Sequence, residues 1–426
     1  MGFWFSLQIA RLKALCIPSS VLRFIQLYKL RKLFAYVDKS IPYYKAFKAR
    51  SFHQLPISDK ALMQENFQNM NASGFTYHQI KQAQFVQSQQ LFVNYSLGTS
   101  GKPSAFLYTQ KEKLNELTSL LANMLPVTFF AQKVAIFYLS ETPYFPKLKS
   151  PFYQWQFFDL KSDVEQLLQK LDAFSPDLLV APVQILCKIA QYQNENKINI
   201  QPKKIVAIHE VLTPIEEKII ATTFSQNVHK LYQCAEGFLG TTCEMGTLHL
   251  DEDNYYIEKE WIDSEKEKFI PVISTLNRRL QPLVRYRMND ILCVQKNPCS
   301  CGSAHVAIKH IIGRCEDMLY FQKYGNNGAL KPIYADDIHL AIAKASGGIE
   351  KYQLRQSSVL NIEIQLKAAN FELAKHCISQ QLEKLSQQLG VKCPFLVFTA
   401  LQSPPVFNIF RQTVRLSSHT SHLSEN

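Results

Sequence analysis

The sequence of 426 residues has no apolar run approaching the roughly 20 residues that a membrane-spanning helix needs. A secretory signal peptide is not indicated either, because Arg11 and Lys13 interrupt the apolar start of the chain. Internal repeats and low-complexity tracts are also missing. These absences favour a cytoplasmic globular protein, and the chain is long enough for a large domain and a smaller one.

Cysteine is too sparse for a disulfide scaffold, because its ten residues are scattered over the whole chain. This distribution fits a reducing compartment. Most of the cysteines, such as Cys16, Cys187 and Cys377, stand in apolar surroundings and are interpreted as small core residues.

Acidic residues are nearly absent from the first 50 positions, where ten lysines and arginines accompany the single Asp38. This segment therefore carries +9 of the chain's net charge of +12. Apolar residues recur at helical spacing between Ala10 and Phe47. We favour basic helices packed on the main domain, and a helix held weakly on an anionic membrane surface is the alternative. No nucleic-acid-binding module accompanies the charge, so no nucleic-acid partner is expected.

Strand-like and helix-like segments alternate from about residue 90 to residue 240. This alternation predicts a layered α/β domain with a largely parallel sheet. The expected strands are 134–139, 177–181, 204–208 and 228–231, and the expected helices are 111–125, 163–171, 183–193 and 214–224.

The pattern changes between residues 245 and 312, where short strand-like runs are separated by turn residues, which predicts an antiparallel β-region. It changes again after Gly313-Arg314, where strands and two helices alternate. The expected fold class is α/β. We expect a large domain at 1–314, with mixed sheets and a β-subdomain, and a small mobile α+β domain at 315–426.

A loop rich in serine, threonine and glycine joins two strand-like runs, Leu91–Tyr95 and Ala105–Thr109. Its glycines permit positive backbone angles, so that consecutive amide groups can converge on a phosphate, and its hydroxyls and lysine add donors and charge. The loop lacks the Ser or Thr that follows Gly-Lys in the Walker pattern. An ordinary surface turn is the alternative interpretation. The candidate contact residues are Ser96, Gly98, Thr99, Ser100, Gly101 and Lys102.

Three further motifs follow in order: Tyr232 to Glu236, Pro282 to Asp290, and Gly313 to Asp317. In order and spacing, the four motifs resemble those of the adenylate-forming enzymes, the superfamily of acyl-CoA synthetases and related ligases. Within it, the chain is most similar to phenylacetate-CoA ligases and to synthetases that adenylylate a deazaflavin coenzyme. The resemblance covers most of the chain up to about residue 355.

The resemblance implies that ATP activates a carboxylic acid as an acyl-adenylate. The acyl group would then pass to the thiol of CoA or of the phosphopantetheine of a carrier protein. Attack on the α-phosphate builds negative charge, which preorganised donors and a metal must balance. The implied roles are phosphate binding by the 96–103 loop with Lys102, Mg²⁺ coordination by Glu236, stacking near the adenine by Tyr232, and ribose binding by Asp290.

The resemblance also places Arg314 at the hinge between the domains, with Glu316 or Asp317 as the pivot. A structural salt bridge is the alternative role for Arg314. A surface glutamate is the alternative interpretation of Glu236, and a turn-forming aspartate is that of Asp290. We interpret His209, beside the expected adenine loop, as an ordinary histidine at a strand end.

The chain departs from the family pattern at several positions. Ala235 and Met288 stand where the family usually has threonine, and Ile409 stands where the family carries a lysine that stabilises the adenylation transition state. Arg411 is the candidate substitute, although a guanidinium is not equivalent to an ammonium. Losing such a charge costs on the order of a hundredfold in rate. Two alternatives therefore stay open: transfer of AMP to a small acceptor, and a nucleotide-binding homologue with impaired catalysis.

Cysteine and histidine form one further constellation, at Cys243, His249, Cys299 and Cys301. Three thiolates and an imidazole make a complete tetrahedral set typical of structural Zn²⁺. Some proteins similar to phenylacetate-CoA ligase have metal ligands in matching positions, so the resemblance supports this assignment. Unconnected thiols are the alternative, and Cys293, His305 and His310 are nearby candidate ligands.

Overall fold

The computed structural model describes residues 18–96, 103–125, 130–138, 152–208, 212, 214–325, 328–401 and 412–414. These residues form two compact units. The larger unit holds most of the chain before Ile311, and the smaller unit begins there and also takes in short pieces near positions 214 and 290. In the described parts of the chain, no helix combines the length and the apolarity that crossing a bilayer requires.

The basic N-terminal region is helical, with α2 at Ser19–Ser40 followed by α3 at Pro42–Lys45. Leu22, Leu30, Leu33 and Val37 of α2 are buried, at the spacing of one helix face. Lys29 Nζ donates to the carbonyl oxygen of Asp253 at 2.7 Å, which fastens α2 to the larger unit. The favoured interpretation, basic helices packed on the main domain, is therefore what the structure shows.

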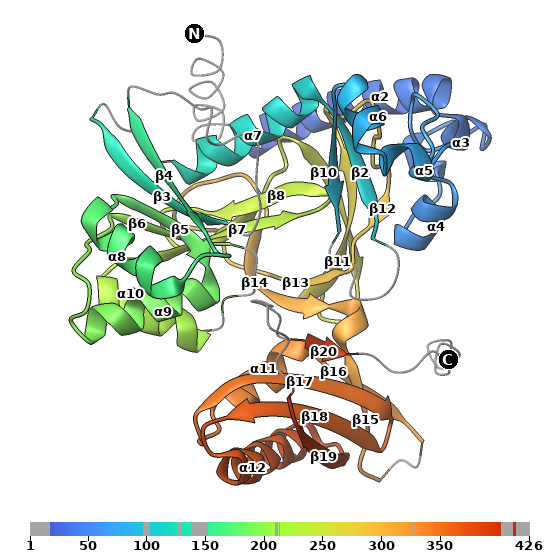
Figure 1. Cartoon of the computed structure of the whole chain (residues 1–426). Coiled ribbons are helices and arrows are strands. Elements are labelled where there is room, and N and C mark those ends of the chain that lie inside the picture. The colour runs from blue at the N-terminus through green and yellow to red at the C-terminus, as the bar shows by residue number, and fades with distance from the viewer. Residues whose placement is uncertain are drawn as a thin grey trace. The chain divides into compact units, whose positions relative to one another are not determined.

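The larger unit contains a block of parallel strands, in the order β4-β3-β5-β6-β7. Helix α7 packs on one face of this block and α8, α9 and α10 lie on the other (Figure 1). Strands covered on both faces are apolar throughout, as in the fully buried β5. The predicted layers are confirmed, and β4 is a strand that we did not expect. The bounds are β3 Gln132–Tyr138, β4 Tyr153–Asp159, β5 Leu178–Pro182, β6 Lys204–Ile208, β7 Val228–Cys234, α7 Gln110–Met124, α8 Val164–Phe174, α9 Val183–Asn194 and α10 Pro214–Phe224.

The sheet continues past β7 with antiparallel strands, in the order β8-β9-β14-β13-β11-β10, and β12 pairs with β11. The predicted antiparallel region is present, but it is part of the same 12-stranded sheet as the parallel block. The β7–β8 hairpin is the place where the sheet changes from parallel to antiparallel pairing. The bounds are β8 Gly237–Thr242, β9 Leu248–Leu250, β10 Tyr255–Trp261, β11 Lys268–Thr275, β12 Tyr286–Arg287, β13 Asp290–Val294 and β14 Ala307–Arg314.

A separate hairpin of β1 (Leu91–Tyr95) and β2 (Ala105–Thr109) precedes α7. Thr109 begins α7 with a capping box, in which its side chain accepts from the amide of Glu112 and the Glu112 carboxylate accepts from the amide of Thr109. The position of β2 is therefore coupled to that of α7. The short helices before this hairpin are α4 Lys60–Glu65, α5 Tyr77–Ile80 and α6 Ala83–Ser88.

The smaller unit has a four-stranded sheet in the order β19-β18-β17-β20 and a two-stranded sheet of β15 and β16. Alternate residues of β18 (Ile362, Ile364 and Leu366) enter its core together with Ile378 and Leu382 of α12. The strands and helices expected after residue 313 are present. The bounds are β15 Leu319–Gln322, β16 Leu330–Ile333, α11 Ala335–Ala343, β17 Ile349–Ser358, β18 Asn361–Ala368, α12 Phe371–Leu389, β19 Phe395–Ala400 and β20 Gln412–Val414.

Candidate active site and metal centre

The candidate phosphate loop is the connection of the β1–β2 hairpin, in which Tyr95 pairs with Ala105. Its base is closed by Ser96 and Ser104. The amide of Ser96 donates to the carbonyl oxygen of Ser104, and the amide of Ser104 donates to Ser96 Oγ, both at 2.8 Å. The loop is therefore anchored at both ends by a regular antiparallel pair. Gly98, Thr99, Ser100, Gly101 and Lys102 lie outside the described residues.

The candidate metal-binding Glu236 occupies the tight turn between β7 and β8, where Cys234 pairs with Gly237. Tyr286 donates its hydroxyl to Glu236 Oε1 at 3.2 Å. Burial, and then the charge of Glu236, raise the pKa of Tyr286 well above its usual value. The phenol therefore stays protonated and orients the carboxylate as a neutral donor.

The backbone of this turn is held by side chains from three other segments. The carbonyl oxygen of Glu236 accepts from Arg278 Nη1 at 2.8 Å and from the Tyr108 hydroxyl at 3.0 Å. The carbonyl oxygen of Ala235 accepts from Asn94 Nδ2 at 3.3 Å. Because Asn94 is on β1 and Tyr108 is on β2, both strands that bound the phosphate loop contact the turn that carries Glu236.

Arg278 strengthens this connection from the interior of the larger unit, where its side chain is buried. Its Nη2 donates to the carbonyl oxygen of Leu107 on β2 at 3.3 Å, and its guanidinium lies 4.0 Å from the centre of the Tyr108 ring. A planar guanidinium can bond two carbonyl groups and stack on an aromatic ring at the same time. Arg278 thus joins the strand leaving the phosphate loop to the Glu236 turn.

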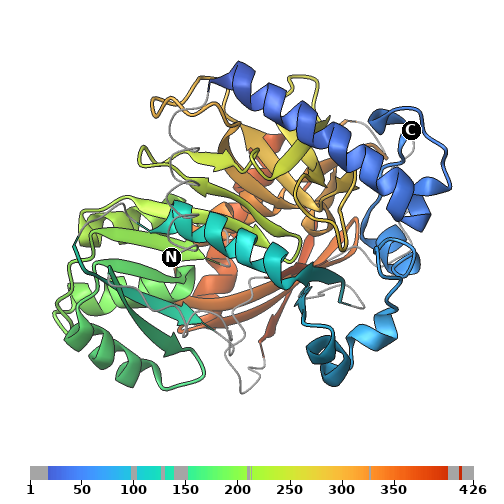
Figure 2. The same cartoon turned by 90° about the horizontal axis from the view of Figure 1, so that it is seen from above.

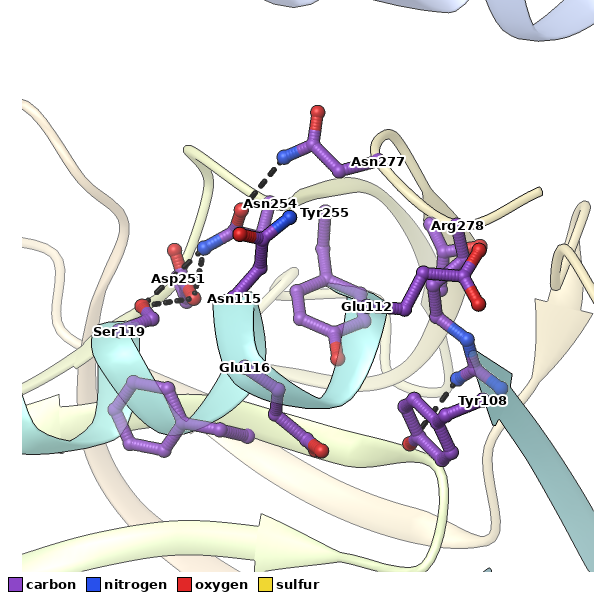
Figure 3. A pocket seen from close by; sticks show the side chains of 12 residues that line it. Tyr108, Glu112, Asn115, Glu116, Ser119, Asp251, Asn254, Tyr255, Asn277 and Arg278 are labelled. Atoms are coloured by element: carbon purple, nitrogen blue, oxygen red, sulfur yellow. Dashed lines mark hydrogen bonds between the residues drawn. The ribbon is translucent and has the colours of Figure 1, made fainter. Parts of the chain in front are cut away.

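A small cavity of about 40 Å³ adjoins this anchor, and Tyr108 and Arg278 line one end of it (Figure 3). At the other end, Asp251 Oδ2 accepts from Asn254 Nδ2 at 2.8 Å and from Ser119 Oγ at 3.3 Å. This volume has room for a few water molecules only. An acyl substrate needs a larger pocket, so this cavity does not hold the acid.

Asp290 and Arg314 lie near each other within the smaller unit. Arg314 Nε stands 3.9 Å from Asp290 Oδ1, and Arg314 is half exposed. The amide of the adjacent Cys315 donates to the carbonyl oxygen of Asn289 at 2.7 Å. The candidate ribose ligand and the candidate hinge arginine therefore form a long ion pair. A pair at this distance, with its arginine half exposed, contributes little to stability, so a purely structural role is weakly supported.

Cys243, His249, Cys299 and Cys301 converge, with their ligand atoms within 4.8 Å of one another. Cys243 Sγ lies 3.7 Å from Cys299 Sγ, and Cys301 Sγ lies 3.3 Å from His249 Nε2. Four ligands around a tetrahedral ion with bonds of about 2.3 Å to sulfur stand about 3.8 Å apart. The side chains present fit Zn²⁺ in ligand type, number and spacing.

The neighbours of this cluster orient its histidine. His249 Nδ1 lies 3.1 Å from the carbonyl oxygen of His305, which fixes that nitrogen as the donor and leaves Nε2 as the ligand atom. The cluster links the β8–β9 turn to the loop between β13 and β14. Cys293 and His310 lie outside the cluster, and His305 contributes its backbone only.

No model of a protein family matches the sequence. Phenylacetate-coenzyme A ligase of Thermus thermophilus is 24% identical over 180 residues, which cover 39% of this chain and 38% of that protein. Protein CapK of Staphylococcus aureus is 24% identical over 238 residues, which cover 55% and 51%. The chain thus spans about half or less of the length of these curated relatives.

Solved structures match over a greater length. A 2-hydroxyisobutyryl-CoA ligase in the postadenylation state, in complex with 2-HIB-AMP, superimposes with a TM-score of 0.68 at 17% identity. The match covers 92% of this chain and 89% of that one. Fatty acyl-adenylate ligases from E. coli and L. pneumophila give a TM-score of 0.54 at 11% identity, over 74% and 66%.

The chain has the fold of the adenylate-forming ligases. The resemblance to this superfamily that the motifs indicated is confirmed, and so is the mixed α/β fold class. At these identities the structural match establishes the fold and leaves the substrate open.

Three candidate residues remain to be placed in this fold: Tyr232, Ile409 and Arg411. Tyr232 is on β7 and 6% exposed, so its ring is mostly enclosed by the protein. Ile409 and the candidate substitute Arg411 lie outside the described residues. Directly after them, β20 pairs in parallel with β17, with Gln412 beside Gln353.

Four residues that hold the Glu236 turn, with Tyr108 among them, were missed by the sequence analysis. Tyr286 stood inside a quoted motif, so its position could have been noticed, but its hydrogen bond could not. Arg278 and Asn94 carried no local signal, because their partners on the turn are 42 and 141 residues away. Only the packing of the β1–β2 hairpin, a sheet of its own, beside the β7–β8 turn brings these groups together.

Proposed function

We propose that this protein uses ATP to activate a carboxylic acid as an acyl-adenylate and passes the acyl group to a thiol of CoA or of a carrier protein. The proposal is supported by the adenylate-forming fold and by the Glu236 turn. A carboxylate oriented by Tyr286 stands on a turn that is joined to both strands bounding a glycine- and serine-rich loop. This connection between the Glu236 turn and the loop carries the proposal. The groups that donate hydrogen bonds to the phosphates and the acid that binds the metal must keep a constant separation during the reaction.

In the first step, a carboxylate oxygen of the acid bonds to the α-phosphorus of ATP, and the bond to the bridging oxygen breaks so that pyrophosphate leaves. The 96–103 loop, with Lys102, would bind the departing phosphates. Glu236 would hold Mg²⁺, which neutralises charge developing on the phosphate oxygens. In the second step, the thiol sulfur attacks the acyl carbon, the thiol proton is lost, and AMP leaves.

Asp290 and Tyr232 are proposed to bind the ribose and the adenine. A carboxylate suits the ribose because it can accept hydrogen bonds from both hydroxyl groups. Arg314 is proposed to act at the hinge, and Arg411 to supply the cation for which the family uses lysine. The four-ligand Cys/His cluster is proposed to bind structural Zn²⁺, since a closed set of ligands leaves no position for a substrate.

Pyrophosphate exchange with a panel of aryl, fatty and hydroxy acids tests the first step. Exchange that depends on one class of acid supports the proposal and names the substrate class. Adding CoA, or a carrier protein bearing phosphopantetheine, then tests the second step through the appearance of a thioester. Glu236→Ala and Lys102→Ala should both abolish exchange, and unchanged activity in these variants would contradict the site assignment.

Two alternatives are favoured by particular residues. Methionine stands at position 288, where the family usually has threonine, so this position has no hydroxyl group to offer a substrate. The Met288 side chain is buried instead. Together with Ile409, this change favours a nucleotide-binding homologue with impaired catalysis. ATP binding by calorimetry without exchange for any acid would identify that case. A stable AMP adduct of a small acceptor, with no thioester, would identify nucleotidyl transfer.

A further inference from the structure

Helix α2 has an apolar stripe on each of two opposite sides. The inner stripe packs on the larger unit. The outer stripe is exposed, with Phe24 73% and Tyr28 53% accessible to solvent. Its members recur at intervals of three and four residues, which places them on one side of the helix. The exposed apolar residues are Val21, Phe24, Leu27 and Tyr28.

Isolated exposed apolar residues are common, but four on one helical stripe form a contiguous patch that marks an interaction surface. The patch does not depend on contacts that hold the fold, because α2 is anchored through its opposite side. Figure 2 shows α2 along the outside of the larger unit, and none of the other elements that the structure describes lies over its outer side. The patch is therefore available to a partner outside the described chain.

The same outer side becomes basic toward the C-terminal end of α2. Arg31, Lys32 and Lys39 are exposed there, with Asp38 as the one acidic side chain of the helix. Lys32 Nζ lies 4.4 Å from the centre of the Tyr28 ring, so charge and aromatic surface are adjacent. The surface thus combines an apolar half and a cationic half along a single helix.

We propose that the outer side of α2 docks on an anionic lipid surface. Phe24, Leu27 and Tyr28 would enter the boundary between headgroups and acyl chains, while Arg31 and Lys32 would contact the anionic headgroups. Aromatic side chains and flanking basic residues are the combination that suits this boundary. This inference does not depend on the chemistry proposed above.

Charge argues against other occupants of this surface. The first 17 residues of the chain contain Arg11 and Lys13 and no acidic residue, so they do not complement a basic helix. A second copy of the chain would bring the same basic residues face to face. A stable protein partner needs about 20 residues or more on each side, which is far more than this stripe provides. An anionic bilayer matches both the charge and the narrow apolar stripe.

The test is co-sedimentation of the full chain with vesicles of phosphatidylcholine, with and without phosphatidylserine. Binding should require phosphatidylserine and should weaken as salt is raised. Reversing two charges, in Arg31→Glu/Lys32→Glu, should lower the partition coefficient by about tenfold or more. Phe24→Ala/Tyr28→Ala should lower it by a similar factor of about ten through loss of apolar surface.

A matched control is Leu373→Ala/Lys384→Glu on α12, where both side chains are also exposed. This control should bind vesicles like the unaltered protein, and circular dichroism of all variants should match it. Equal sedimentation with both vesicle types, or full binding by both α2 variants, would overturn the proposal. So would a concentration-dependent dimer that Phe24→Ala/Tyr28→Ala dissociates, because the stripe would then bind a second copy.

Discussion

The guanidinium of Arg278 donates to the carbonyl oxygen of Glu236 at 2.8 Å. Through a second nitrogen, the same group donates to Leu107 on the strand that leaves the candidate phosphate loop. A buried cation therefore links the two segments that are proposed to hold the nucleoside triphosphate. Arg278 acts by positioning these two segments, since its guanidinium donates to backbone carbonyl groups of the turn and of β2.

We expect Arg278→Lys to lower the rate of pyrophosphate exchange about tenfold. One ammonium group cannot reproduce the two contacts of the guanidinium fork. A buried carbonyl group then loses its hydrogen-bond donor, which costs about 1–3 kcal/mol of stability. The magnesium concentration at half-maximal rate should rise as the Glu236 turn loosens. Arg279→Lys is the matched control, because Arg279 bonds the carbonyl oxygens of Leu276 and Arg278. Equal effects of the two substitutions would contradict the role given to Arg278.

Glu236→Gln should reduce exchange by on the order of a hundredfold or more, because the amide lacks the charge that binds Mg²⁺. Tyr286→Phe should have a smaller effect, about tenfold, since it removes one hydrogen bond to a charged group and leaves the carboxylate in place. Gln233→Ala, at an exposed position beside the same turn, serves as the control. Steady-state exchange rates at saturating ATP measure all three. A Tyr286→Phe variant with the full rate would remove the orienting role of the phenol.

Gly237 follows the Glu236 turn at φ +148°, and a Cβ added there would overlap the phenol oxygen of Tyr255. We expect Gly237→Ala to destabilise the protein by about 1–3 kcal/mol more than a glycine substitution in open space. Gly74→Ala is that comparison, because Gly74 also has a positive φ, +67°, and has no neighbouring atom within 4 Å of an added Cβ. Urea unfolding followed by tryptophan fluorescence gives the difference. Equal losses would show that backbone strain alone determines the cost.

The Cys/His cluster should bind one zinc ion per chain, measurable by elemental analysis of the purified protein. Cys299→Ser/Cys301→Ser should lose the metal and unfold at a lower temperature, because the ion joins two segments that are distant in sequence. Cys377→Ser, on α12 and not one of the four clustered residues, should retain both the metal and the melting temperature. Absence of metal from the native protein, or an unchanged melting temperature in the double variant, would count against the site.

Much of the architecture could be predicted because it depends on local patterns. The strands between 130 and 240 show continuous apolar runs, and the helices show apolar residues at helical spacing. Helix ends also have local signals, as in the capping box of Thr109 and Glu112 at the start of α7. The edge strand β4 was missed, since its exposed and half-buried positions do not show the continuous apolar run of a central strand.

The sequence by itself determined the order of most elements, the residue types of the Cys/His cluster and the motifs that indicate a nucleotide-binding ligase. The tertiary structure decided which distant groups meet. His249 comes near Cys299 and Cys301 because β9 pairs with β14 in a register that places His249 beside Ala307. Arg278 reaches Leu107 across 171 residues because the β1–β2 hairpin, a sheet of its own, packs beside the segment that follows β11. Such contacts depend on the register of strand pairs and on the packing of elements that are distant in sequence, and no local propensity specifies either.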